Sequence, residues 1–425
     1  MTTAVATAAF TRARTRTFWG LLIGYGAFYL CRNNLSAAAS LLDAGLHIDK
    51  ARFGQIASAG TLCYAVGKVL AGPIADRIGG RRVFLVGLYV SAAANFALTL
   101  GGPIGVFVGL WSLSRLFQSL GWAGLVQIMP NWFAPAQYGT AMGAISTSYQ
   151  LGGAVTPILL AGLMLVTTGW QPLFAIPGLA LIGTGLLAQR WIAQRPSALG
   201  LPDLHTEPSA TVATPQIEGP IAWHVPMRKL LSRPGFWIAL GLSFSLTLIR
   251  ETFGLWMPRY FADLGAANAA AVLKSTAFPI LGLTGTLLAG WISDRFSGGR
   301  RGPVMAAMLL GLVASLVALA HLQGLSAQLG LEPQTLALPL TGLVGFCLLG
   351  PYSMVGGGVI ALDFGGKDAA ATAAGLLDGV GYFGASLAGV GVAALVERAG
   401  WSGAWQALAA LSGLSVILCI PLWNR

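Results

Sequence analysis

Two arginines lie where charged residues are rare, deep within long apolar runs. Arg32 falls about fifteen residues into the run 17–42, and Arg250 falls about fifteen residues into the run 235–262. A helix rises about 1.5 Å per residue, so both arginines are expected near the middle of a bilayer. A charge at that depth is costly unless it faces a polar cavity or a partner. Each arginine is therefore a candidate binding residue, with a structural ion pair to a membrane acid as the alternative.

Polar residues accompany both arginines at helical spacing. Spacings of 4, 3 and 4 residues separate Tyr25, Tyr29, Arg32 and Ser36. These four residues therefore share one helical face. The equivalent positions of the second half are Ser243, Thr247, Arg250 and Gly254. Each half is therefore expected to present a polar stripe centred on its arginine, although such residues also occur in packed helix contacts.

A lysine adds a third charge. Lys68 lies inside the apolar run 53–75, one helical turn after Tyr64. The planar guanidinium group binds phosphate or carboxylate oxygens in pairs, and lysine contributes a point charge. Two guanidinium groups and an ammonium group would therefore suit a compact dianion. Without an anion they would repel one another, which gives a physical reason for obligatory exchange of one anion for another.

Two acidic residues modify this charge balance. Glu251 follows Arg250 directly, and Asp378 lies early in a later apolar run. Adjacent helical positions point about 100° apart, so Glu251 is not required to pair with Arg250. Each acid either neutralises a neighbouring cation or acts as a proton-coupling carboxylate with a raised pKa. Three cations and two acids would leave one positive charge, which suits a monoanion or a singly protonated phosphate or phosphonate.

The elements that position these residues are membrane helices. The chain has 425 residues, of which 55% are hydrophobic and only 9% are charged, whereas soluble domains are near 25% charged. We predict an all-α polytopic membrane protein with twelve transmembrane helices, in two pseudo-symmetric six-helix halves. The predicted spans are 17–42, 53–75, 82–101, 104–128, 138–165, 169–190, 235–262, 270–295, 302–322, 336–362, 368–396 and 401–422.

An internal repeat supports the two halves. GPIADRIGGRR begins at Gly72 and GWISDRFSGGRR begins at Gly290, which is a shift of 218 residues. The same shift carries Arg32 onto Arg250. Parallel repeats of this kind occur in transporters whose site lies at the repeat interface. We predict an N-terminal half over residues 1–190, a cytoplasmic linker over 191–232 and a C-terminal half over 233–425.

The repeated loop motif sits between helices and carries both signs of charge. We expect it to form a conformational latch that makes and breaks as the halves rock, or simply to set topology by its positive charge. The latch residues would be Asp76, Arg77, Arg81, Asp294, Arg295 and Arg300. Arginine-bearing connections all fall on one side if the helices alternate. We therefore predict an integral protein of the bacterial cytoplasmic (inner) membrane with both termini in the cytoplasm.

Other functional classes are disfavoured. The net charge of +11 is spread over short connections, which argues against nucleic acid as a partner. The four cysteines form no C-x-x-C motif and the four histidines lie in loops or near helix ends, so we expect no metal site. No nucleophile–base motif or phosphate-cradling loop indicates an enzyme, and no cofactor is expected. Nothing marks an interface, so a monomer embedded in the lipid bilayer is the default expectation.

Several motifs resemble one known family. GYGAFYLCRNNLSAA around Arg32, CYAVGKVLAGPIADR around Lys68 and IRETFGLWMPRY around Arg250 are similar to helices 1, 2 and 7 of the organophosphate:phosphate antiporter family of the major facilitator superfamily. STSYQLGG, GPYSMV and TAAGLLDGVGYFG resemble its helices 5, 10 and 11. The resemblance implies antiport of a phosphorylated small molecule against inorganic phosphate, with the arginines clamping the phosphoryl group. The candidate substrate-binding residues are Arg32, Arg250, Lys68, Tyr25, Tyr29, Tyr64, Tyr149 and Tyr382.

Departures from the family pattern leave the substrate open. Asn33 stands where relatives often carry a second basic residue. Tyr149 stands where glycerol-phosphate carriers have a histidine, and Leu377 where hexose-phosphate carriers have a selectivity lysine. Two alternatives remain: a sensor of sugar phosphate with a transporter fold, and a proton-coupled carrier of an organic carboxylate.

Overall fold

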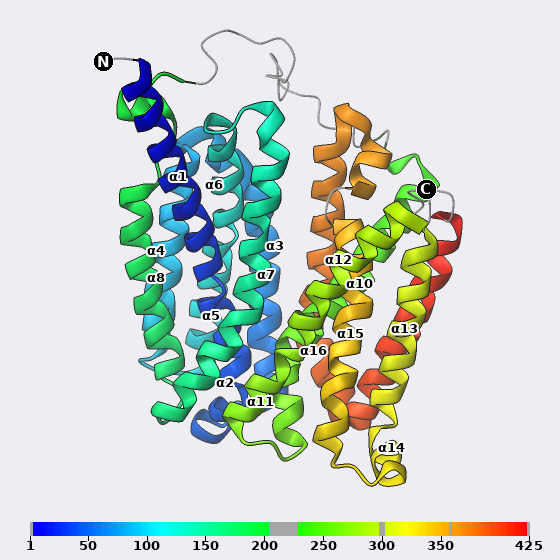
Figure 1. Ribbon diagram of the computed structural model, residues 1–425. Coiled ribbons are helices and arrows are strands. Elements are labelled where there is room, and N and C mark those ends of the chain that lie inside the picture. The colour runs from blue at the N-terminus through cyan, green and yellow to red at the C-terminus, as the bar shows by residue number, and fades with distance from the viewer. Residues whose placement is uncertain (1–2, 204–227, 229, 297–301, 357–358, 423–425) are drawn as a thin grey trace. The chain divides into compact units, whose positions relative to one another are not determined.

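The computed structural model describes residues 3–203, 228, 230–296, 302–356 and 359–422, and nearly all of them are helical (Figure 1). No strand occurs among these residues. The first half of the sequence contains α1 (Thr3–Ala27), α2 (Leu30–Leu46), α3 (Lys50–Ile78), α4 (Gly80–Leu98), α5 (Ile104–Gln118), α6 (Leu120–Ile128), η1 (Met129–Asn131), α7 (Pro135–Val166), α8 (Pro172–Trp191) and η2 (Pro196–Leu199). The second half contains α10 (Pro234–Asp263), α11 (Asn268–Ser275), α12 (Ala277–Phe296), α13 (Gly302–Ala320), α14 (Leu322–Leu329), α15 (Pro333–Gly356), α16 (Val359–Cys419) and η3 (Ile420–Leu422).

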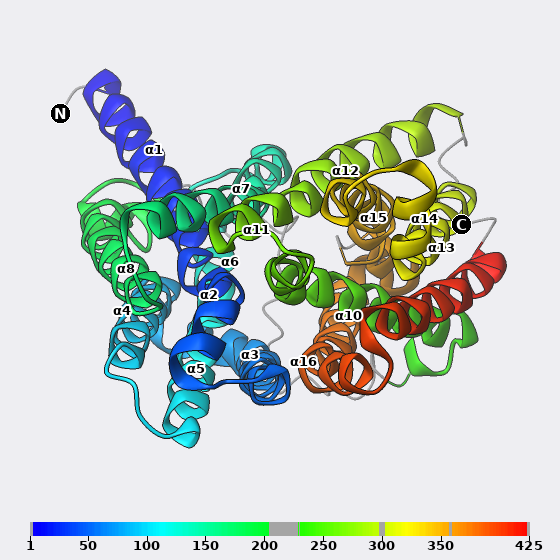
Figure 2. The ribbon, with the colours of Figure 1, turned by 90° about the horizontal axis from the view of Figure 1, so that it is seen from below.

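The helices form two compact units, each made of segments that are not continuous in sequence. Unit 1 comprises Met1–Asn34, Cys63–Thr156 and Gln171–Ile221. Unit 2 comprises Leu35–Leu62, Pro157–Trp170 and Ala222–Arg425. Seen along the helices in Figure 2, members of unit 1 such as α4 and α8 lie side by side, and they are in extensive contact. The units divide α2, α3 and α7 between them, and the sequence boundaries of the two repeat halves therefore stay a prediction.

Eight helices of the described chain are long and apolar enough to cross a membrane. They account for nine of the twelve predicted spans, because Ala373–Cys419 contains two of them. Within α16 the chain turns at Gly400, whose φ of +65° is a conformation that favours glycine. The other three predicted spans coincide with α1–α2, α3 and α5–α6, and these are the segments that carry Arg32, Lys68 and Arg115.

Two of those spans are broken helices. The first break falls at Phe28 and Tyr29, between α1 and α2, where the Tyr29 amide donates to the Gly26 carbonyl at 3.1 Å. Glycine and aromatic residues are weaker helix formers than alanine or leucine, and GYGAFY is rich in both. The second break falls at Ser119, between α5 and α6, where the Ser119 hydroxyl donates to the Leu116 carbonyl at 2.6 Å.

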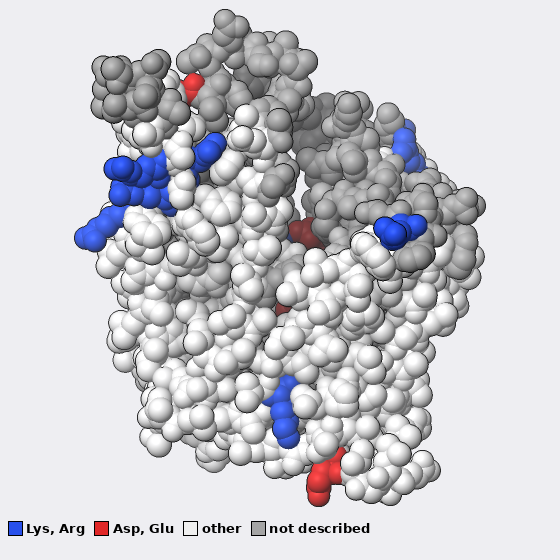
Figure 3. Space-filling model, in the orientation of Figure 1, with Lys and Arg blue, Asp and Glu red and all other residues white. Residues whose placement is uncertain are grey.

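The outer surface of the described helices is largely apolar. Large hydrophobic side chains such as Leu165 (78% exposed) and Val166 (79%) face outward. On the face drawn in Figure 3, most of the described surface between the two ends is white, meaning uncharged, and lysine and arginine gather toward the ends. This distribution is what a bilayer-spanning surface requires.

Candidate functional site

Three cations of unit 1 surround one buried tyrosine. Tyr64 on α3 is only 1% exposed. The guanidinium carbons of Arg32 and Arg115 lie 4.5 Å and 4.7 Å from the centre of its ring, and the ammonium nitrogen of Lys68 lies 5.9 Å from it. Each distance is within the range of a cation–π interaction. The predicted residues Arg32, Tyr64 and Lys68 are therefore brought together, with Arg115 as a further member.

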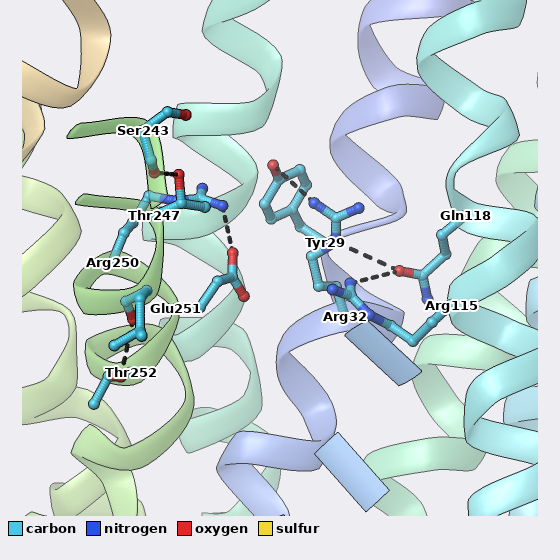
Figure 4. Close-up of polar contacts among 10 residues, drawn as sticks. Tyr29, Arg32, Arg115, Gln118, Ser243, Thr247, Arg250, Glu251 and Thr252 are labelled. Carbon is cyan, nitrogen blue, oxygen red and sulfur yellow. Dashed lines mark hydrogen bonds and ion pairs between the residues drawn. The ribbon is translucent and has the colours of Figure 1, made fainter. Parts of the chain in front are cut away.

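An amide joins the two guanidinium groups of this cluster. The Oε1 atom of Gln118 accepts from Arg32 Nε at 3.4 Å and from Arg115 Nη1 at 3.3 Å (Figure 4). The amide nitrogen of Gln118 donates to the Cys31 carbonyl at 2.9 Å and to the Ser114 hydroxyl at 3.1 Å. Gln118 is 1% exposed, so these bonds fix both arginines at one buried acceptor.

Close helix packing places α3 against α5 and α6 at this point. A Cβ atom at Gly67 would lie 2.2 Å from the Ser119 hydroxyl oxygen and 2.9 Å from the Leu116 carbonyl oxygen. Only glycine leaves room for that approach. Gly67 directly precedes Lys68, so this contact carries Tyr64 and Lys68 of α3 to Arg115 and Gln118 of α5.

Arg115 is the residue of this cluster that sequence reasoning missed. It is 4% exposed and lies on α5, within the predicted span 104–128. A charge inside an apolar run was the signal that selected Arg32 and Arg250, and the same signal was available for Arg115. With Arg115 included, the candidate residues contain four cations instead of three. After the two acids Glu251 and Asp378 are subtracted, the expected net charge is two instead of one.

The predicted tyrosines of the first half lie close to Arg32. Arg32 Nη1 donates to the Tyr29 hydroxyl at 3.2 Å, and its guanidinium carbon lies 4.8 Å from the Tyr29 ring centre. Tyr25 is buried against Tyr29, with ring centres 6.4 Å apart, and against Trp122, at 5.2 Å. Tyr149 on α7 is half-buried and packs at the edge of the same hydrophobic cluster. Tyr25 and Tyr29 thus form one wall beside the arginine.

The arginine of unit 2 has a different environment. Arg250 on α10 forms an ion pair with the adjacent carboxylate of Glu251 (Figure 4). Its guanidinium carbon lies 4.8 Å from the centre of the Tyr352 ring on α15. Both side chains of the ion pair are partly buried, at 19% and 26% exposure. The angular separation of neighbouring helical positions therefore does not keep these two side chains apart.

The remaining polar positions on α10 are used for packing. The Ser243 hydroxyl donates to the Leu377 carbonyl of α16 at 2.7 Å, and the Thr247 hydroxyl donates to the Ser243 carbonyl at 2.6 Å. Both residues are at most 5% exposed. A Cβ atom at Gly381 would lie within 2.8 Å of both hydroxyl oxygens. This part of the predicted polar stripe is a helix contact between α10 and α16.

Two further predicted residues lie on α16. Tyr382 is buried at 6% exposure, and Asp378 is half-buried one turn before it. Both lie on the part of α16 that packs against α10 through Gly381 and Gly384. The sequence assigned them to substrate binding and to coupling or charge balance respectively, and both assignments stay predictions.

An ion network in unit 2 links α2 and α3 to α10 and α16. Asp263 pairs with Lys50 at 2.6 Å and with Arg259 at 3.1 Å, and it accepts from the Trp401 indole at 2.9 Å. Arg259 pairs in addition with Asp43 at 2.5 Å. We call these four charged residues, Asp43, Lys50, Arg259 and Asp263, the Asp263 network. No sequence signal identified it, because its members lie near helix ends, where charges are common.

Close contacts to the backbone also join these helices within unit 2. The Ser36 hydroxyl donates to the carbonyls of Gly254, at 3.0 Å, and Leu255, at 2.6 Å. Ser36 and Gly254 are 218 residues apart, so the contact joins equivalent positions of the repeat. A Cβ atom at Gly54 would lie 2.7 Å from the Gly389 carbonyl oxygen. Segments from the two sequence halves therefore meet closely here.

The predicted latch residues are only partly described. Asp76, Arg77 and Arg295 are exposed. Arg81 binds the end of α8, because its Nε donates to the Ile192 carbonyl and its Nη2 to the Gln189 carbonyl, both at 2.7 Å. The Asp294 side chain and the whole of Arg300 lie outside the described residues. Arg81 thus has a structural role within unit 1, whatever its role in a latch.

Comparison with known proteins gives consistent matches along the chain. The sequence profile of the Major Facilitator Superfamily matches residues 21–389. A probable hexose phosphate transport protein of Chlamydia trachomatis is 30% identical, with 97% of this chain and 91% of that protein aligned. The membrane sensor protein UhpC of Escherichia coli is 28% identical over 96% and 91% of the two chains. The hexose-6-phosphate:phosphate antiporter of Escherichia coli is 26% identical over 95% and 88%.

Solved structures agree on the fold. The crystal structure of the nucleoside transporter NupG superposes with a TM-score of 0.71 at 14% sequence identity, covering 96% of this chain and 99% of that one. This likeness supports the twelve-helix architecture, and the sequence relatives are named as transport proteins, an antiporter or a membrane sensor protein, not as enzymes. The chain therefore belongs to the Major Facilitator Superfamily and, within it, to the organophosphate:phosphate antiporter family.

Proposed function

We propose that this chain is a secondary active transporter that exchanges a phosphorylated or phosphonate organic anion for inorganic phosphate by alternating access. The observation that carries the proposal is the cluster of Arg32, Lys68 and Arg115 around Tyr64. Guanidinium groups bind phosphoryl oxygens in pairs, and lysine is a common phosphate ligand. Arg115 is buried and Arg32 and Lys68 are half-buried, and a concentration of such groups in membrane helices is a functional feature by default.

The charge of this cluster suits exchange. Neighbouring cations in a partly dehydrated site repel one another more strongly than they would in water. A bound anion offsets that repulsion, so the protein with an anion bound would change conformation more easily than the empty protein. Return of the binding site would then require a second anion, which is obligatory exchange.

Arg250 gives the second half a matching role. It occupies the repeat position of Arg32, and we include it among the phosphoryl-binding residues for that reason. Its ion pair with Glu251 supplies an internal counter-charge that an incoming anion would displace. Removing one partner of a buried ion pair is costly, so Glu251 would stabilise Arg250 while no anion is bound. Tyr149, Tyr352 and Tyr382 would complete the site, and Asp378 would contribute to charge balance.

Conformational change would depend on contacts at both ends of the helices. The Asp263 network and the Ser36–Gly254 contact lie within unit 2 and join segments of the two sequence halves, so they would stabilise the described conformation. The latch would consist of Asp76, Arg77, Arg81, Asp294, Arg295 and Arg300. The positive charge of the connections supports a bacterial cytoplasmic membrane location with both termini in the cytoplasm, and we propose a monomer.

A sensor is the second candidate function. One relative of nearly full-length similarity is named a membrane sensor protein. A sensor would use the same cationic cluster to bind a sugar phosphate, but binding would not lead to flux. Binding and flux must therefore be measured on the same preparation.

Exchange in proteoliposomes tests the proposal. Vesicles containing the purified chain are loaded with phosphate, and uptake of labelled phosphate is measured with unlabelled phosphate esters, phosphonates and carboxylates as competitors. We expect saturable uptake that one phosphate ester or phosphonate inhibits. Binding without uptake would support the sensor, and inhibition by carboxylates alone would support the proton-coupled carrier.

A further inference from the structure

Of the three cations around Tyr64, Arg115 alone is buried, and this distinguishes its role from that of Arg32 and Lys68. It is 4% exposed, it lies 4.7 Å from the Tyr64 ring centre and it shares the Gln118 amide oxygen with Arg32. A guanidinium group stays protonated at any physiological pH. Arg115 therefore adds a permanent positive charge immediately beside Arg32.

The sequence around this cluster is one-sided in charge. The six spans predicted for the first half contain Arg32, Lys68, Arg115 and the terminal Arg82 and Arg190, but no Asp or Glu. The described contacts of the two central arginines include an amide oxygen, a phenol oxygen and aromatic rings. These groups carry no net charge, and they stabilise a cation through their dipoles and ring electrons. The field near Arg32 consequently grows with each cation of the cluster.

We propose that Arg115 makes the cluster select doubly charged anions over singly charged anions of the same shape. This inference rests on the proposed function, because it names the charge class of the substrate of that same site. Arg115 is covered by its neighbours, so it acts as a positioning residue and a fixed charge behind Gln118 and Tyr64, and does not touch the anion. At a separation of several ångströms, one added charge on the ligand changes affinity by roughly tenfold.

A purely structural role makes a different prediction. If Arg115 only held Gln118 and Tyr64 in place, its loss would weaken the binding of all anions by the same factor. If its charge matters, its loss would weaken the binding of dianions more than that of monoanions. The ratio of the two affinities separates these roles, since a uniform loss leaves that ratio unchanged.

Methyl phosphate and methyl sulfate provide the matched probes. Both are small tetrahedral esters, but methyl phosphate carries two charges at pH 8, because the second pKa of a phosphate ester is about 6, and methyl sulfate carries one. Displacement of labelled phosphate from the purified full-length chain gives the affinity of each. We expect the wild-type chain to bind methyl phosphate at least tenfold more tightly. In Arg115→Gln that ratio should fall by roughly tenfold.

Two variants serve as controls. Arg115→Lys keeps the positive charge but loses the planar guanidinium group. Its ratio of methyl phosphate affinity to methyl sulfate affinity should therefore stay close to the wild-type ratio, even if both affinities are reduced. Arg190→Gln removes one positive charge from an exposed position on α8 and should leave the ratio unchanged. If Arg115→Gln does not fold, Arg115→Met, which keeps the apolar stem, replaces it.

The outcomes also separate this inference from the proposed function. No phosphate binding by the wild-type chain would contradict the proposed function itself. Phosphate binding with a wild-type ratio near one, or with equal ratios in the wild type and the neutral variants, would overturn the role of Arg115 alone. A ratio that Arg115→Lys fails to restore would show that the role of Arg115 depends on its geometry and not on its charge.

Discussion

Arg32 and Arg250 occupy equivalent positions of an internal repeat, yet their surroundings differ. Arg32 follows a helix break and contacts an amide, a phenol and the Tyr64 ring, in a cluster with Arg115 and Lys68. Arg250 lies inside the unbroken helix α10 and pairs with Glu251. The 218-residue repeat thus retains the position of the charge, whereas the surroundings of the two arginines differ.

This difference suggests a division of labour between the two units. Unit 1 concentrates positive charge around Tyr64, where we propose that an anion binds. In unit 2 the carboxylate of Glu251 already offsets the charge of Arg250, and we propose that a bound anion displaces that carboxylate. Each prediction below would break or sharpen this comparison.

The largest expected effect is on phosphate exchange, when the planar guanidinium group of Arg32 or Arg250 is removed. Arg32→Lys and Arg250→Lys should each reduce phosphate exchange by about 100-fold, because lysine keeps the charge but cannot bind two oxygens in parallel. Exchange in proteoliposomes measures the effect, with Arg190→Lys on the exposed side of α8 as the matched control. Normal transport by either variant would show that this arginine does not clamp the anion.

A smaller effect is expected from the internal counter-charge. Glu251→Gln should tighten phosphate binding by roughly tenfold and slow exchange, since Arg250 would no longer be neutralised. Affinity is measured by displacement of labelled phosphate, and turnover by exchange. If Glu251 is instead a proton-coupling carboxylate, the variant would lose the pH dependence of transport without any gain in affinity.

The smallest effect concerns the Asp263 network. Asp263→Asn keeps an acceptor for Trp401 but removes the charge that pairs with Lys50 and Arg259, whose contacts with Asp263 are partly exposed. Such pairs contribute about 0.5–1 kcal/mol, so Tm should fall by roughly 1–3 °C. Thermal unfolding in detergent measures this change, with the exposed Glu332→Gln as control. An unchanged Tm would mean that the network does not stabilise the described conformation.

The sequence was sufficient to predict the fold, and it also selected candidate site residues, whose roles stay predictions. Apolar runs and the 218-residue shift predicted the two six-helix halves, and isolated charges identified Arg32, Lys68 and Arg250. Arg115 also lies inside an apolar run, 104–128, but it was not among the predicted site residues. The helix breaks at Phe28–Tyr29 and Ser119 were not predicted, because continuous apolar runs conceal local changes in hydrogen bonding.

Contacts between helices could not be predicted in the same way. The bridge from Gln118 to both arginines and the Asp263 network depend on which helix faces meet, and hence on packing. Ser243 and Thr247 show the converse, since polar residues at helical spacing proved to be part of a packed contact with α16. A polar residue within an apolar run is therefore a candidate site residue. Whether it contacts a ligand or a neighbouring helix depends on how the helices pack.

Obligatory exchange is the central claim, and efflux tests it most directly. Proteoliposomes loaded with labelled phosphate are diluted into buffer with or without external phosphate, at equal ionic strength. We predict fast efflux only when external phosphate is present, and slow efflux in both buffers for Arg32→Lys. Equally fast efflux into phosphate-free buffer would contradict the account, because the empty cationic site would then return without an anion.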